Sequence, residues 1–160
     1  MIVIADTSPI NYLVLIDHIE VLPKLYGRIL TPPAVCDELR SALAPLPVRR
    51  WIAHPPLWLE VQAASRAPDA ALLQAQLGAG EREAILLAQE LAADELIIDE
   101  LRGRREAHRR HLHFTGTLGV LLLAGDRGLL DFQNAIAQLR STSFYIEAKL
   151  LDRLIRGEGI

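Results

Sequence analysis

Residues 1–8, MIVIADTS, place a fully apolar run near the start of the chain and end it on a carboxylate. Because residues 2–5 leave no polar side chain at alternate positions, they predict a strand covered on both faces, as in a parallel sheet between helices. Asp6 follows at the carboxyl end of that strand, where ligands bind in open α/β sheets. Residues 7–9 supply a hydroxyl N-cap and an early proline, so a helix should begin at once. Helix capping is the alternative role for Asp6.

Strand and helix patterns alternate along the rest of the chain. Further short strands are predicted at 28–30, 57–61, 96–98 and 111–115, the second of them at a sheet edge. Helices are predicted at 33–42, 68–77, 81–92, 102–113, 118–124, 132–139 and 145–155. This alternation predicts a three-layer α/β/α sandwich around a central, mainly parallel sheet. We expect a single domain over residues 1–160, because no composition shift or repeat marks a second unit.

Composition limits the classes of protein to consider. Hydrophobic residues make up 51% and charged residues 23% of the chain, which is typical of a folded protein and excludes a disordered one. The net charge of -3 argues against wholesale coating by nucleic acid but allows a local basic patch. Cys36 is the single cysteine, so the chain can form neither an internal disulfide nor a thiolate zinc site. With no apolar run of about 18 residues, we expect a cytoplasmic protein without a membrane segment.

Two regions carry apolar side chains for which the sequence offers no obvious cover. Residues 44–66 contain four prolines, which predict that no helix forms there, and Trp51 and Trp58 should be exposed unless a partner covers them. Residues 144–155 hold more apolar side chains than one amphipathic helix needs. The alternative is that both sets complete the core of the monomer.

Two helices place one glutamate inward and a neighbouring acid elsewhere. At about 100° per residue, Glu38 falls at the edge of the buried arc of its helix, whereas Asp37 points to solvent. Glu81 falls on the apolar face of the helix at 81–92, whereas Glu83 lies on another side. The helix dipole favours an acid in the first turn, but an unpaired carboxylate on a buried face is costly.

A second acid ends a strand, because Asp99 follows the apolar run at 96–98. If the strands are neighbours, Asp6, Glu38, Glu81 and Asp99 converge at one edge of the sheet. Converging carboxylates repel one another, so either some of them stay protonated or a cation neutralises them. Oxygen ligands of this kind favour Mg²⁺ or Mn²⁺, and sites of this kind usually catalyse reactions of phosphate groups.

Five segments together resemble a known family, the PIN-domain nucleases. They are IADTS, TPPAVCDEL, GEREAILLAQEL, LIIDE and TGTLGVL, and they span nearly the whole chain. The likeness is to the VapC-like branch, the toxin halves of VapBC-type toxin–antitoxin pairs, in which GExEAI and TGTLGVL occur together. The resemblance implies that Asp6, Glu38, Glu81 and Asp99 are the first to fourth catalytic, metal-binding acids.

The same resemblance suggests supporting residues, which are Thr7, Glu83, Glu100 and Thr115. Thr115 stands where the family often has a hydroxyl or amide near the metal, and Glu83 competes with Glu81 for the place of the third acid. Glu100 either assists Asp99 or faces solvent.

An arginine-rich helix follows the fourth acid. Arg102, Arg105 and Arg109 fall on one face with His108 beside them, and guanidinium groups so placed could follow an RNA phosphate backbone. A solvated helix face without a ligand is the alternative.

The resemblance implies a Mg²⁺- or Mn²⁺-dependent ribonuclease that cleaves single-stranded RNA. It also implies the toxin role, a homodimer and a small antitoxin protein that covers the acidic pocket. A catalytically inactive PIN-like module that binds RNA or protein is the alternative. A phosphoacceptor receiver domain fits less well, because neither Lys24 nor Lys149 follows a strand in the way that such a domain requires.

Overall fold

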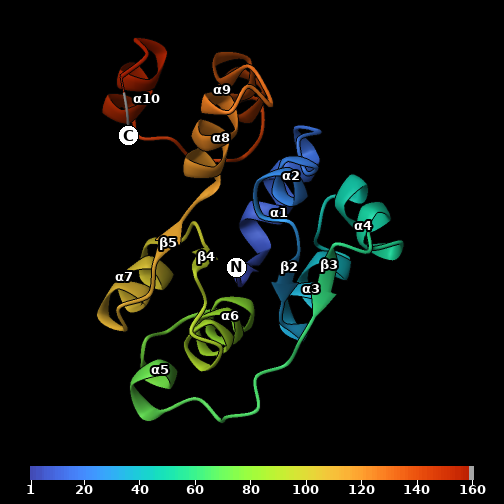
Figure 1. The fold of residues 1–160 in the computed structure, drawn as a ribbon, viewed down its shortest axis with the longest axis vertical. Helices are drawn as coiled ribbons and strands as arrows, with labels where there is room; N and C mark the ends of the chain where they lie inside the picture. The colour runs from blue at the N-terminus through green and yellow to red at the C-terminus, as the bar shows by residue number, and fades with distance from the viewer. Residues whose placement is uncertain (159–160) are drawn as a thin grey trace.

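β1 (Val3–Ala5) lies at the centre of a five-stranded parallel sheet in this computed structural model, which describes residues 1–158 (Figure 1). The strand order is β3-β2-β1-β4-β5, and all the strand pairs are parallel. The other strands are β2 (Ile29–Thr31), β3 (Leu59–Val61), β4 (Glu95–Ile97) and β5 (Phe114–Thr115). The predicted parallel sheet, with the strand of residues 59–61 at an edge, is therefore confirmed.

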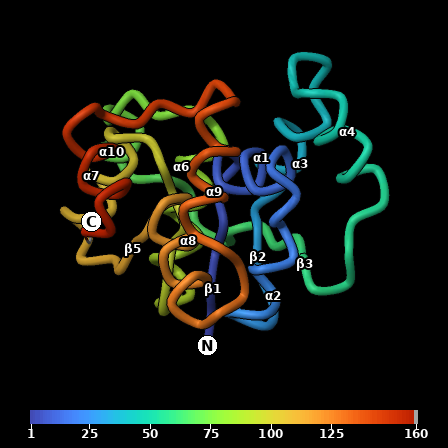
Figure 2. The backbone as a smooth tube through the Cα atoms, turned by 90° about the horizontal axis from the view of Figure 1, so that it is seen from above, coloured from blue at the N-terminus to red at the C-terminus, as the bar shows by residue number. Residues whose placement is uncertain are grey.

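Helices cover both faces of this sheet. In chain order they are α1 (Thr7–Leu15), α2 (Val21–Tyr26), α3 (Pro33–Arg40), α4 (Leu46–Ala53), α5 (Ala70–Gln74), α6 (Ala79–Glu90), α7 (Leu101–Arg109), α8 (Thr117–Asp126), α9 (Phe132–Arg140) and α10 (Ala148–Ile155). The view from above places α3 and α4 at one end of the molecule and α7, α10 and β5 at the other (Figure 2). The architecture is the predicted three-layer α/β/α sandwich.

The unbroken apolar run of β1 is explained by two separate cores. Val3 and Ala5 pack on one face with apolar residues of α1, α2, α3, α4, α8 and α9, whereas Ile4 packs on the other face with α5, α6 and α7. All three side chains are fully buried. A central strand with helices on both sides has no solvent face, so it needs no alternating polar residue.

The strand order creates a switch point beside β1. The chain moves outward from β1 to β2 and β3, then returns to the other side of β1 for β4 and continues outward to β5. The connections therefore leave a crevice at the carboxyl ends of β1 and β4, the place where open α/β sheets bind ligands. Asp6 follows β1 directly, and Asp99 lies two residues beyond the end of β4.

Residues 44–66 are more regular than the sequence predicts, because α4 forms within them. Pro45 is its N-cap and Pro47 lies in its first turn, where the missing N–H groups would have no helical partner in any case. The predicted exposure of the tryptophans is also wrong. Trp51 and Trp58 are half-buried against the core, with ring centroids 5.9 Å apart.

α7 ends at Arg109, four residues before the predicted end. His111 takes a φ of 56°, and the Leu112 N–H donates to the carbonyl of Ala107, so the chain turns out of the helix and β5 begins only at Phe114. Within residues 1–158, no helix has the length and apolar character needed to cross a membrane.

Candidate active site

Asp6 is buried at the carboxyl end of β1 and does not cap the helix that follows. It occupies the N-cap position of α1, but its side chain makes no capping hydrogen bond there. The residue is 2% exposed, and its Oδ1 has no hydrogen-bond partner among the described residues. The capping alternative is therefore wrong, and a costly carboxylate remains to be explained.

The pKa of Asp6 is raised to about 8, and burial is the largest cause. The Thr7 amide lowers this pKa, whereas the negative charges of Glu81, Glu38 and Asp99 contribute to raising it. The four acids singled out from the sequence are therefore close enough to act on one another electrostatically. Without a compensating cation, Asp6 is mostly protonated at neutral pH.

Glu38 is brought to the crevice by α3, which packs against α6. Its Oε2 accepts a short hydrogen bond from the Thr7 hydroxyl, and its Oε1 accepts one from the Gly80 N–H at 3.1 Å. The Thr7 hydroxyl therefore helps to orient the Glu38 carboxylate.

The structure separates the two competing glutamates of α6. Glu81 Oε1 accepts from the Gly78 N–H at 3.3 Å, and its Oε2 is buried without a hydrogen-bond partner in the described residues. Burial raises the pKa of Glu81, with Glu100 and Glu38 adding to the effect and Arg102 opposing it. Glu83 instead accepts from the Ala34 N–H at 3.2 Å, at the start of α3. Of these two glutamates, Glu81 lines the acidic cleft at the switch point and Glu83 does not.

Asp99 is held by three hydrogen bonds. Its Oδ1 accepts from the Thr117 N–H at 2.7 Å, and its Oδ2 accepts from the hydroxyls of Thr117 at 2.7 Å and Ser8 at 2.9 Å. Thr115, the hydroxyl singled out from the sequence, instead lies against Gly119. The TGT motif contains two threonines two residues apart, and only the turn into α8 decides which of them reaches Asp99.

An open cleft of about 330 Å³ lies at the switch point. Its lining comprises Asp6, Thr7, Ser8, Asn11, Tyr12, Glu38, Glu81 and Glu100. The exposed Glu100 is thus at the cleft, whereas Asp99 lines a neighbouring groove. Sequence reasoning missed Ser8, Asn11 and Tyr12. The helical period could have predicted them. Asn11 and Tyr12 lie one helical turn after Thr7 and Ser8 and therefore share the same face of α1.

Three glycines allow the acids to approach the backbone closely. A Cβ at Gly103 would lie 2.8 Å from Glu81 Oε2, and one at Gly116 would lie 2.7 Å from Asp99 Oδ1. A Cβ at Gly80 would overlap the Glu38 carboxylate. Any other residue at these positions would displace an acid side chain.

The donor set fits a hard divalent cation. Within residues 1–158, no three His, Cys, Asp or Glu side chains are already placed around one ion position, so binding would require the carboxylates to adjust. Asp6 Oδ1 and Glu81 Oε2 are nevertheless buried oxygens without partners, and a cation would satisfy both. Carboxylate and hydroxyl oxygens without nearby thiolates suit Mg²⁺ or Mn²⁺ better than zinc.

The predicted arginines of α7 lie beside the site but have different surroundings. Arg105 and Arg109 line a surface pocket, and Arg109 also pairs with Glu106 at 3.4 Å. Arg102 is exposed and acts electrostatically on Glu81. Arg110 has a structural role, because it pairs at 2.8 Å both with the buried Glu106 and with a residue outside α7, Asp69.

The fold and the cleft define a class of protein, an α/β/α sandwich with an acidic site at the switch point of its sheet. Residues 2–159 match a family model described as a PIN domain, so the chain belongs to the PIN-domain family. PIN domains are generally nucleases and generally use divalent metal ions. A search among curated proteins found no match, and neither did a search among solved structures.

Asp6→Asn should stabilise the metal-free protein, and the gain should grow with pH. The pKa of Asp6 rises from 3.8 to about 8 on folding, so the native state binds more protons and loses stability as the pH rises from about 4 to about 8. The free energy of unfolding should therefore differ little between variant and wild type near pH 4 and by a few kcal/mol near pH 8. Urea unfolding in EDTA at both pH values measures this difference.

Asp37→Asn is the matched control, because it removes an exposed carboxylate from α3. This variant should follow the wild-type pH dependence. A gain for Asp6→Asn of equal size at both pH values would contradict the assigned burial cost.

Proposed function

We propose that this protein is a Mg²⁺- or Mn²⁺-dependent endoribonuclease that cleaves phosphodiesters of single-stranded RNA. The observation that carries the proposal is the pair of buried, unpartnered oxygens, Asp6 Oδ1 and Glu81 Oε2, at the switch point of a PIN-domain sheet. Such oxygens destabilise the fold in the absence of a cation and so favour cation binding.

Each acid has a distinct part in this proposal. Asp6 and Glu81 hold the cation, which when bound activates water and stabilises the charge that develops on a phosphate. Glu38 is oriented by Thr7 and by a backbone N–H, and Asp99 is fixed by its three donors. A preorganised carboxylate set of this kind loses little entropy when substrate and cation enter. The products carry 5′-phosphate and 3′-hydroxyl ends.

We also propose that the chain acts in the cytoplasm as the toxin of a toxin–antitoxin pair. Beside the acidic cleft lies a second pocket of about 330 Å³, which shares Thr7, Asn11 and Glu38 with it. Leu43 lines this pocket and is 96% exposed. A small antitoxin could seat an apolar side chain there while an arginine pairs with the carboxylates of the cleft.

A catalytically inactive PIN-like module that binds RNA or protein is the second candidate. The absence of a ready-made group of three ligands within residues 1–158 favours it. The two candidates differ in whether a divalent cation binds and whether RNA is cut.

Asp6→Asn should abolish both properties. Mn²⁺ titrated by calorimetry should bind the wild type but not the variant, and cleavage of a mixed single-stranded RNA should fall by more than about 100-fold, since even residues that only support metal ligands cost about 10–100-fold. Asp37→Asn should behave as wild type. Equal Mn²⁺ binding by Asp6→Asn and wild type, cleavage that persists in excess EDTA, or cyclic phosphate ends would overturn the proposal.

Gly80→Ala should separate activity from stability. Alanine favours a helix by about 1 kcal/mol over glycine, but here its Cβ would push the Glu38 carboxylate out of place. We expect cleavage to fall about 10- to 100-fold with the melting temperature preserved. Gly78→Ala is the matched control, because its Cβ would lie 3.4 Å from Glu81 Oε1, an ordinary contact. Equal cleavage by both variants would show that the position of Glu38 does not matter.

A homodimer is the assembly we propose, formed through the apolar side of α10. Ile155 is 53% exposed there, and Leu151 is partly exposed. Light scattering at micromolar concentration should give about twice the chain mass of 17.7 kDa, and Ile155→Glu should reduce it to one chain. A wild-type mass of one chain would reject the dimer.

The lack of any short arginine-bearing protein encoded beside this chain would remove the case for an antitoxin.

A further inference from the structure

Two hollows meet on the side of the molecule that carries β5 and α7. The first is a groove of about 320 Å³ that begins at Asp99 and runs between the start of α8 and the segment before α10. Its walls include Gly116, Gly119, Phe144 and Tyr145. The second is a basic pocket of about 410 Å³ on the surface of α7. It is lined by Leu101, Arg104, Arg105, His108, Arg109 and Phe114.

Arg104 and Phe114 line both hollows and so form a ledge between them. The Arg104 guanidinium lies over the Phe114 ring, 5.3 Å from its centroid, in a cation–π arrangement. Figure 1 shows β5, which carries Phe114, running from beside α7 toward α8, with α10 beyond. The groove, the ledge and the basic pocket therefore make one continuous track that starts at the fourth acid.

The chemistry changes along this track. The groove is mainly apolar, includes Gly116 and Gly119 and the 81% exposed ring of Tyr145 in its wall, and carries the acids Asp99 and Glu147 beside Arg104. These surroundings suit a neutral, planar group that can stack and donate hydrogen bonds. The basic pocket lies on the other side of Arg104 and Phe114 from the groove. In it, Arg105 and Arg109 are one helical turn apart, about 6 Å along the helix axis. These surroundings suit successive anionic groups.

We infer that the RNA strand follows this track, with one base in the groove against Phe114 and Tyr145 and the phosphates beyond it on Arg104, Arg105 and Arg109. This rests on the proposed function and adds to it a base-binding subsite and a direction for the strand. Base–aromatic stacking accepts any base, and arginines hold the backbone. The arrangement suits single strands, because only an unpaired base can be splayed out to stack on an aromatic side chain.

An acidic peptide is the competing occupant, and the charges disfavour it. The basic pocket would accept its carboxylates, but Asp99 and Glu147 in the groove would repel any that followed. RNA carries both neutral bases and charged phosphates. A base suits the groove that contains Asp99 and Glu147, and the phosphates suit the basic pocket.

The test measures binding without cleavage. A fluorescent single-stranded RNA is titrated by anisotropy into the full wild-type chain in EDTA at several salt concentrations. Arg105→Gln should weaken binding and lower the slope of log affinity against log salt by about 0.7, as expected for the loss of one phosphate contact on a single strand. Phe114→Leu should weaken binding about 5- to 150-fold without changing the slope.

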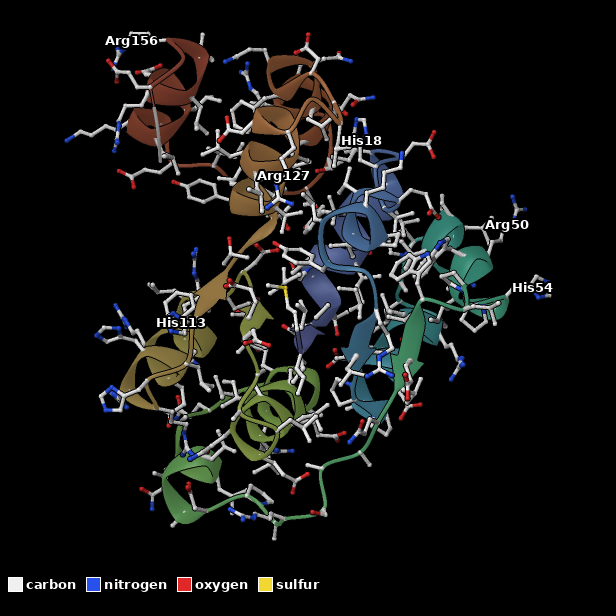
Figure 3. All side chains as sticks on the ribbon, in the orientation of Figure 1. His18, Arg50, His54, His113, Arg127 and Arg156 are labelled. Atoms are coloured by element: carbon white, nitrogen blue, oxygen red, sulfur yellow. The ribbon has the colours of Figure 1, made fainter. Side chains whose placement is uncertain are left out.

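Two further variants keep the result interpretable. Tyr145→Ser alters an exposed ring and so should leave folding intact, but it should weaken binding in the same way as Phe114→Leu. Arg50→Gln removes an exposed arginine from α4. Figure 3 shows Arg50 and His113 on opposite sides of the molecule, so this variant should leave RNA affinity and its salt dependence unchanged. RNA with an abasic backbone should lose the effect of both aromatic variants.

The outcomes separate the two proposals. If Arg105→Gln, Phe114→Leu and Tyr145→Ser all bind as Arg50→Gln does, or if an acidic peptide displaces the RNA at equal concentration, the track is wrong even when Mn²⁺ supports cleavage. If binding depends on the track but no RNA is cut in Mn²⁺, the track stands and the nuclease proposal fails. Where RNA is cut, Arg105→Gln should raise KM and leave kcat unchanged.

Discussion

A carboxylate buried at the end of the central strand is the constraint on which the site depends. Asp6 follows a strand with helices on both faces and is only 2% exposed, although it lines the open cleft. Burial disfavours its charged form, and three neighbouring acids disfavour it further. A protein under no functional demand would place an apolar or neutral residue there, since a buried, unpartnered carboxylate lowers stability. The Asp6 carboxylate is therefore in an unfavourable environment that a bound cation would relieve.

The other acids differ in how they are held, and this difference suggests a division of roles. Glu38 and Asp99 already accept hydrogen bonds on both oxygens, so their positions are fixed before any ligand arrives. Asp6 and Glu81 each keep one buried oxygen without a partner. Glycines behind Glu38, Glu81 and Asp99 allow the close approach that this arrangement requires. Fixed and unpartnered oxygens side by side are suited to a cation whose position must be defined to within a fraction of an ångström.

Charge is segregated on a chain whose net charge is only -3. The acidic cleft lies at the switch point, and the arginines of α7 follow Asp99 in the chain, on the helix between β4 and β5. One further arginine, Arg110, is used to pair α7 with the start of α5 and takes no part in this segregation. A polyanion approaching the molecule would be drawn to the arginines and would reach the carboxylates only where a cation offsets their repulsion.

The sequence by itself determined the central strand, the layered fold, the place of Asp6 at the carboxyl end of that strand, and the inward direction of Glu38 and Glu81. These features follow from local rules, because a run of apolar residues and a helical period fix which way a side chain points. Only the tertiary structure decided that Thr117 and not Thr115 holds Asp99, that Arg104 stacks on Phe114, and that Trp51 of α4 and Trp58 pack against the core. Each of these depends on contacts between segments far apart in the chain, such as the turn from β5 into α8 beside the end of β4. No local pattern encodes which of two nearby hydroxyls or arginines such a contact will select.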